Sequence, residues 1–223
     1  VLSNGICSLQ PGQKRFAKSV YIHYDPQGKI LGTEFANSII CSRARLTYDQ
    51  ADHILKGKAE GFPGEVTALL KDMEILARAI EARRDKNGMI HLDLPETELV
   101  LDKAGRVVDA HPADDSYPHT IIEMFMVEAN VAVASALDRF GIPFMRRIHP
   151  DPDAVSTKNI SRFVKLCGIR VPRHLDRNAI QDLLASVKET PLSYAVNMYI
   201  LRSMQKAEYS PLNIGHFALA DRH

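Results

Sequence analysis

The sequence predicts an α+β (mixed α/β) fold in which an antiparallel or mixed sheet packs with several helices. Segments with strand-like alternation and segments with helical spacing occur in separate groups, without a regular strand-helix-strand repeat. Hydrophobic residues make up 45% of the chain and charged residues 25%, which is the balance of an ordinary globular protein. A chain of 223 residues is long enough for one large domain around a single core.

The first third of the chain predicts a β-hairpin followed by two helices. Apolar and polar residues alternate over residues 16–24, the turn residues Asp-Pro-Gln-Gly follow at 25–28, and residues 29–41 continue as a second strand. Residues 47–56 predict a short helix. Residues 65–87 predict a long helix with one apolar face, because leucine, isoleucine, methionine and alanine recur there at helical spacing.

The remainder predicts short strands and then four helices. Alternation predicts strands between residues 89 and 110, including a hairpin that pairs 99–101 with 107–108. A helix over 118–140 is apolar nearly all round, so we expect it to run through the interior. The last three predicted helices cover residues 156–167, 176–190 and 192–209.

Charge and cysteine content exclude several functional classes. The net charge is +1, from 28 basic and 27 acidic residues, and this does not indicate nucleic-acid binding by itself. Cys7, Cys41 and Cys167 are odd in number and widely spaced, which predicts reduced thiols in a cytoplasmic protein rather than disulfides or a zinc site. We expect no segment that spans a membrane.

Short motifs along the chain, in order, closely resemble the ribonuclease II/ribonuclease R family. They occupy residues 2–9, 42–48 (SRARLTY), 121–123 (IIE), 129–130 (AN), 147–149 (RIH) and 209–220 (YSPLNIGHFALA). The resemblance implies that residues 1–223 are the central part of one RNB-type exoribonuclease domain. On this basis the chain begins after the family's aspartate cluster and ends before its Ser-Pro-Ile-Arg-Arg motif.

The resemblance implies a processive 3′-to-5′ hydrolase of single-stranded RNA that releases nucleoside 5′-monophosphates. It implies Mg²⁺ as cofactor, with ligands outside this chain, and therefore neither a catalytic residue nor a metal ligand within it. We expect single-stranded RNA as the partner, no membrane, a monomer and a cytoplasmic location. The alternative is a non-catalytic RNA-binding or scaffolding module with a degenerate RNB fold.

Tyr48 is the first candidate for RNA binding, since the resemblance places the tyrosine of SRARLTY on the RNA path. An aromatic ring stacks on any base, which suits an enzyme that does not select a sequence. An ordinary core tyrosine is an equally good interpretation. Arg43 and Arg45 lie on one side of a predicted extended segment, where they either contact phosphates or are solvated.

Glu123 is the second candidate, and the resemblance puts it near the 3′-terminal nucleotide. Glu123 and Asn130 are seven residues apart and so share one face of the predicted apolar helix. We expect this carboxylate to be buried. If Glu123 has a structural role instead of a role in RNA binding, we expect Arg147 or another basic residue to be its partner. We also expect Tyr48 and Glu123 to share one accessible cleft.

Arg147 and His149 are the remaining candidates, from the family's Arg-Val-His motif at the end of a strand-like segment. His149 either acts on a ligand or bonds a backbone carbonyl. His216 is expected to pack or to position backbone. Adjacent aspartates occur at Asp114 and Asp115, but they lie in a polar loop typical of a solvated turn and predict no metal site.

Overall fold

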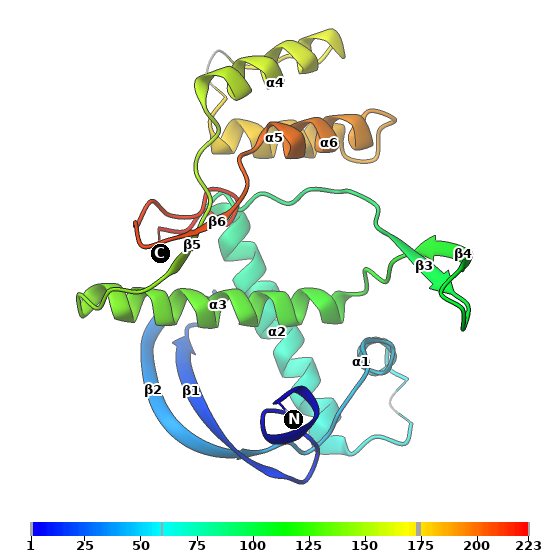
Figure 1. The fold of residues 1–223 in the computed structure, drawn as a ribbon, viewed down its shortest axis with the longest axis vertical. Helices are drawn as coiled ribbons and strands as arrows, with labels where there is room; N and C mark the ends of the chain where they lie inside the picture. The colour runs from blue at the N-terminus through cyan, green and yellow to red at the C-terminus, as the bar shows by residue number, and fades with distance from the viewer. Residues whose placement is uncertain (1, 59, 173–174, 223) are drawn as a thin grey trace. The chain divides into compact units, whose positions relative to one another are not determined.

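The computed structural model describes residues 2–58, 60–172 and 175–222. The chain, coloured from blue to red along its length in Figure 1, divides into two compact units. The first unit contains Val1–Arg83 and Asp115–Arg139, and the second contains Arg84–Asp114 and Phe140–His223. Helices and small antiparallel sheets occur in both units, which confirms the predicted α+β class.

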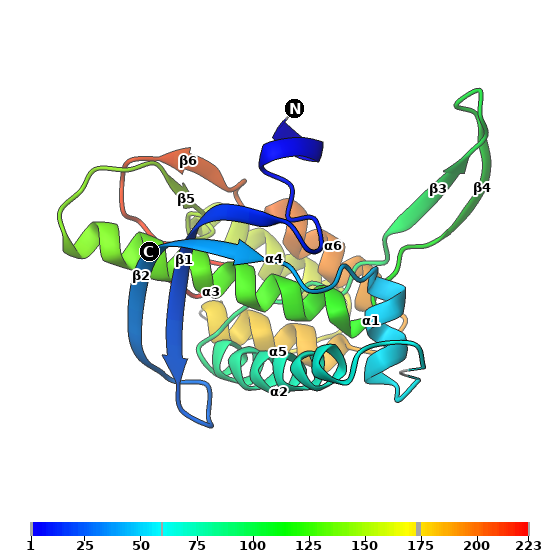
Figure 2. The same ribbon diagram turned by 90° about the horizontal axis from the view of Figure 1, so that it is seen from below.

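The first unit confirms the predicted hairpin and helices. The hairpin strands pair in antiparallel register and curve strongly along their length (Figure 2). The elements are a π-helical turn at Leu2–Ile6, β1 (Lys14–Tyr24), β2 (Ile30–Cys41), α1 (Tyr48–Leu55), α2 (Gly64–Lys86) and α3 (Tyr117–Arg139).

The turn between β1 and β2 is closed by Asp25 and Gly28. The Asp25 carboxylate accepts hydrogen bonds from the backbone N–H groups of Gln27 at 2.9 Å and Lys29 at 2.8 Å. Gly28 has a φ of 76°, and a Cβ there would lie 2.7 Å from the carbonyl oxygen of Ala79 on α2. Only glycine combines this backbone conformation with so close an approach, so the turn docks directly on α2.

The carboxylate of Glu128 holds three elements of the first unit together. Glu128 lies on α3 and is 2% exposed. Its Oε2 accepts a hydrogen bond from the Tyr24 hydroxyl of β1 at 2.9 Å and pairs with an Arg83 guanidinium nitrogen of α2 at 2.6 Å. A buried carboxylate requires such partners, because burial without them would cost several kcal/mol.

Helix α3 is less enclosed than its sequence predicts. Ile121, Met124 and Val127 are buried, but Ile122 is 48% and Met126 55% exposed, so one apolar face is open. Within the described residues, α3 is also the one helix long and apolar enough to cross a membrane by length and composition. Core helices commonly share this length and composition, so the expectation that no segment spans a membrane stays a prediction.

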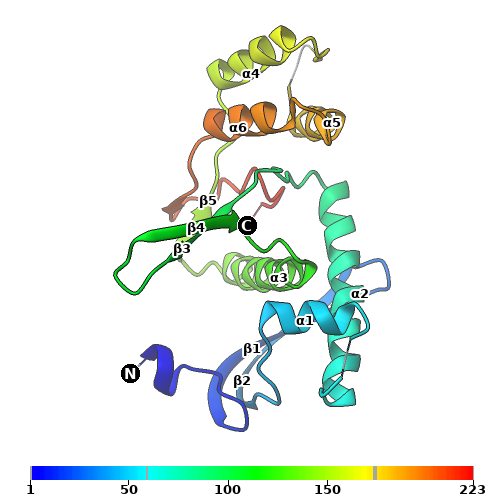
Figure 3. The same cartoon turned by 90° about the vertical axis from the view of Figure 1, so that its right-hand side faces the viewer.

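The second unit contains a helical core and two small sheets. Its elements are β3 (Thr97–Leu101), β4 (Val107–Pro112), β5 (Arg146–Ile148), α4 (Ala154–Leu166), α5 (Arg177–Val187), α6 (Ser193–Ser203) and β6 (Glu208–Ser210). The β3–β4 hairpin extends away from α4–α6, which stack together (Figures 1 and 3). Buried Ile160, Val164, Ile180, Val196 and Ile200 form the core between these helices.

Two predicted elements of the second unit differ in the structure. The helix predicted over 192–209 ends at Ser203, because Met204 adopts an extended backbone and residues 208–210 pair with β5. The strand predicted from residue 89 is irregular as far as residue 96, and the Ile90 N–H bonds to the carbonyl of Ala218. In the described residues, the expected sheet is three separate two-stranded antiparallel sheets.

Replacing Glu128 with glutamine should lower the free energy of unfolding by about 3 kcal/mol, because the change leaves the Arg83 guanidinium without its buried counter-charge. Chemical denaturation measures the effect. Glu123→Gln, on the same helix but exposed, is the matched control and should change stability by less than about 0.5 kcal/mol. Equal effects of the two changes would contradict a stabilising role for the buried pair.

Candidate functional site

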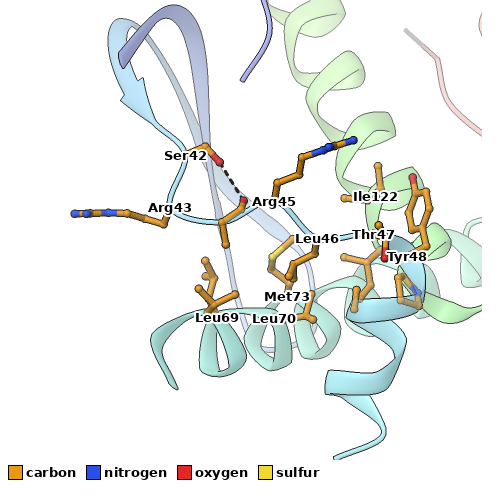
Figure 4. Close-up of a pocket in the computed structure, with 15 residues that line it drawn as sticks. Ser42, Arg43, Arg45, Leu46, Thr47, Tyr48, Leu69, Leu70, Met73 and Ile122 are labelled. Atoms are coloured by element: carbon orange, nitrogen blue, oxygen red, sulfur yellow. Dashed lines mark hydrogen bonds between the residues drawn. The ribbon is translucent and has the colours of Figure 1, made fainter. Parts of the chain in front are cut away.

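The first unit contains a pocket of about 800 Å³ beside the segment that joins β2 to α1 (Figure 4). Apolar side chains of α2 and α3 supply seven of the fifteen lining residues, and the polar residues come from the joining segment and from Tyr48 at the start of α1. The residues that line it are Ser42, Arg43, Ala44, Arg45, Leu46, Thr47, Tyr48, Ala51, Val66, Leu69, Leu70, Met73, Pro118, Ile121 and Ile122.

Tyr48 is held at the edge of this pocket by the start of α1. Thr47 caps the helix, since its Oγ1 accepts from the Gln50 N–H at 3.3 Å while the Gln50 Oε1 accepts from the Thr47 N–H at 2.9 Å. Tyr48 is 42% exposed, which excludes the core-tyrosine interpretation. It stacks on the imidazole of His119, with 3.6 Å between ring centroids and 21° between planes.

His119 lies in the first turn of α3, which is itself anchored on α2 by Tyr117. The Tyr117 hydroxyl donates to the Glu81 carboxylate at 3.0 Å, and the Arg78 guanidinium lies 3.9 Å from the centre of the Tyr117 ring. Burial, and then the hydrogen bond to Glu81, raise the pKa of Tyr117 to about 12. Tyr117 therefore stays a neutral hydrogen-bond donor throughout the physiological range.

Arg43 and Arg45 are both exposed and alternate with half-buried Ser42, Ala44 and Leu46. Their backbone positions agree with the predicted extended segment. Their side chains nevertheless extend in opposite directions, away from one another (Figure 4). Two guanidinium groups along one exposed segment can each contact a separate phosphate of an extended nucleic-acid strand.

Glu123 is exposed, and so is Asn130, so the expectation of a buried carboxylate at this position was wrong. The buried carboxylate of α3 is Glu128. Tyr48 lines the pocket as expected, but Glu123 is not among the residues that line it. Glu123 follows His119 by one helical turn, so the two side chains lie on the same face of α3.

Arg147 and His149 belong to the second unit. Arg147 is an exposed residue of β5, with its guanidinium 5.2 Å from the ring centre of Tyr209 on β6. His149 is buried: its Nδ1 accepts from the Ala218 N–H at 3.3 Å, and its Nε2 lies 2.8 Å from the Gln205 carbonyl oxygen. This pattern fits the tautomer with hydrogen on Nε2, and it commits both ring nitrogens to backbone groups.

His216 packs beside His149, with 5.0 Å between the ring centroids. Burial, and then the neighbouring His149 and Arg147, lower the pKa of His216 to about 4. Its Nδ1 accepts from the Leu219 N–H at 3.3 Å, which requires a neutral ring. His216 therefore positions the backbone of residues 215–221, as expected from the sequence.

Carboxylates that could bind a metal are dispersed. Asp153 caps α4 by accepting from the Ser156 N–H at 2.6 Å, and this bond lowers the pKa of its carboxyl group. Asp109 lies on β4, and Asp114 and Asp115 lie in the irregular segment before α3. Across residues 2–58, 60–172 and 175–222, no three His, Cys, Asp or Glu side chains are grouped so that they could hold a metal ion.

A family model described as the RNB domain matches residues 1–223. The chain belongs to the RNB family. It is 34% identical over 226 residues to ribonuclease R of Thermotoga maritima. The matched region covers 98% of this chain and 31% of that relative. This RNB chain thus spans about a third of the length of the curated relatives that it matches.

Solved structures resemble the RNB chain over its whole length. The apo form of Mycoplasma genitalium RNase R matches with a TM-score of 0.95 at 31% identity. The match covers 100% of this chain and 35% of the RNase R chain. The same enzyme in complex with ribose-methylated single-stranded RNA gives the same values. Yeast Ssd1, a pseudonuclease, covers 96% of this chain and 27% of its own, with a TM-score of 0.67 at 20% identity, a likeness of fold alone.

Two residues that matter to the site of the RNB chain, Glu128 and His119, were not predicted from the sequence. Glu128 was missed because its partners Tyr24 and Arg83 are distant in sequence. His119 was missed because a single histidine at a helix start has no distinctive pattern. Its position four residues before Glu123, one turn away on the same helix face, was the signal that could have singled it out.

Lowering the pH from 7 to 5 should destabilise the protein through His216. The pKa is about 4 in the folded state and 6.5 for an ordinary histidine, so the unfolded chain binds more protons in this window and the free energy of unfolding falls. Allowing for partial exposure, we expect His216→Gln to remove about 1 kcal/mol of this pH dependence. Thermal unfolding at both pH values measures it, with exposed His23→Gln as control. An unchanged pH dependence in His216→Gln would refute the assignment.

Proposed function

We propose that this chain guides single-stranded RNA in a processive 3′-to-5′ exoribonuclease that releases nucleoside 5′-monophosphates. The observation that carries the proposal is the likeness of the whole chain to an RNase R solved with single-stranded RNA. The geometry of the first unit supports it, because an exposed aromatic ring and two exposed arginines follow one another along residues 43–48.

The proposed RNA path uses contacts that do not select a sequence. Tyr48 offers a ring for a base to stack on, which contributes about 1–3 kcal/mol per base whichever base is present. Arg43 and Arg45 contact phosphates, which every nucleotide carries. We propose that Glu123, exposed beside this path, accepts hydrogen bonds from the sugar hydroxyls of the terminal nucleotide.

We propose a lesser part for the second unit. Arg147 is exposed and contacts a phosphate in this proposal. His149 was predicted to bind RNA, and that stays a prediction. Because both of its ring nitrogens bond backbone groups, we propose that it acts by holding the end of β5, on which Arg147 lies.

We propose Mg²⁺ as the cofactor of the hydrolysis. The described residues do not fit a magnesium site, since two-metal hydrolysis needs several carboxylates that converge on one point and none converge here. The ligands in this proposal therefore lie outside the described residues, and we derive no chemical step from this chain. Its own contribution is to bind and orient the RNA.

The full-length protein that carries this chain should release mononucleotides from the 3′ end of a labelled single-stranded RNA in Mg²⁺, and EDTA should stop it. The 223-residue chain alone should release none, because no carboxylates converge on one point within the part of it that the structure describes. Gel analysis of RNA labelled at either end distinguishes the polarity. RNA binding without hydrolysis by the full-length protein would favour the alternative, a non-catalytic RNA-binding module.

Glu123→Gln in the full-length protein should reduce the rate of mononucleotide release about tenfold or more, as expected when a charged group that accepts hydrogen bonds becomes neutral. Stability should change little, since the side chain is exposed. Glu65→Gln, an exposed substitution at the start of α2, is the control. Normal rates for Glu123→Gln would remove Glu123 from the proposed site.

A further inference from the structure

The stacking partner of Tyr48 covers one face of its ring, so at most the other face is available to a base. His119 lies on the covered face at a centroid distance of 3.6 Å, too close for water or a base to enter between the rings. Tyr48 is nevertheless 42% exposed as a residue and lines the pocket, so part of it stays accessible away from His119. A base that stacks on Tyr48 would therefore extend an existing column of His119 and Tyr48.

The position of His119 does not depend on Tyr48. His119 lies two residues after Tyr117, whose hydroxyl bonds Glu81 and whose ring contacts Arg78, both on α2. The His119 N–H also bonds the carbonyl of Ser116 at 3.1 Å. The first turn of α3 is thereby fixed on α2, and it offers the Tyr48 ring a rigid surface.

Tyr48 is less firmly held on its own element. It is the first residue of α1, and the capping box of Thr47 and Gln50 fixes its backbone but not its side-chain torsions. An exposed aromatic side chain at this position has several accessible rotamers. The contact with His119 selects one of them.

His119 also fixes the spacing between Tyr48 and Glu123. One helical turn separates His119 from Glu123 on the same face of α3. With Tyr48 stacked on His119, the ring is held about one helical turn from the backbone of Glu123. A base on Tyr48 and the sugar hydroxyls near Glu123 can then be contacted together without further ordering of the protein.

We propose that His119 is a positioning residue for RNA, which holds the Tyr48 ring in the orientation that a base stacks on. The inference rests on the proposed function, that residues 43–48 lie on the path of single-stranded RNA. Phenylalanine at position 119 would preserve the stack, because the contact requires a flat ring rather than a hydrogen bond or a charge. Alanine would remove it.

A double-mutant cycle in the full-length protein tests the proposal. The affinity for a single-stranded oligonucleotide is measured in EDTA, which separates binding from hydrolysis, for wild type, Tyr48→Ala, His119→Ala and the double variant. We expect His119→Ala to weaken binding about two- to tenfold, the range of one aromatic pair, and His119→Phe to restore it to within about twofold. Exposed His23→Ala is the matched control and should bind normally.

The cycle separates failure of this inference from failure of the proposed function. If His119 acts through Tyr48, His119→Ala should have no effect once Tyr48 is alanine. An unchanged affinity of His119→Ala, an additive loss in the double variant, or no rescue by phenylalanine would each overturn the positioning role while RNA binding remains. No RNA binding by the wild-type protein would overturn the proposed function, and the inference with it.

Discussion

The buried carboxylate of Glu128 is the contact on which the first unit depends. Apolar packing is non-directional and would allow α3 to rotate, since Ile122 and Met126 are as apolar as the residues that it buries. The bonds of Glu128 to Arg83 and Tyr24 exist in one rotation only. They fix which face of α3 carries His119 and Glu123, so a structural ion pair determines the geometry of the candidate RNA site.

Local signals in the sequence predicted most of the fold. The hairpin follows from alternation and an Asp-Pro-Gln-Gly turn, and the starts of α1, α4 and α5 coincide with side-chain caps at Thr47, Asp153 and Asp176. The failures depend on distant partners. Residues 208–210 pair with β5, and the segment after residue 89 bonds Ala218, and neither interaction leaves a periodic pattern in the sequence.

The candidate site was predicted in part, for a related reason. Tyr48 was found through the SRARLTY motif, and its exposure agrees with a role in binding. The buried carboxylate of α3 was assigned to Glu123 rather than Glu128. Helical spacing shows that Glu123 and Asn130 share a face of the helix. It does not show whether this face or the face of Glu128 is the one that packs against a partner. The answer depended on Arg83 and Tyr24, which only the folded chain brings to Glu128.

We propose that RNA runs along residues 43–48 beside the first turns of α3. Photochemical crosslinking tests it most directly, with an oligonucleotide that carries 4-thiouridine near its 3′ end and the full-length protein in EDTA. Mass spectrometry of the peptides should place crosslinks on Tyr48 or its neighbours in 43–48 and on the peptide that contains His119 and Glu123. Efficient crosslinking that avoids both segments would contradict the account.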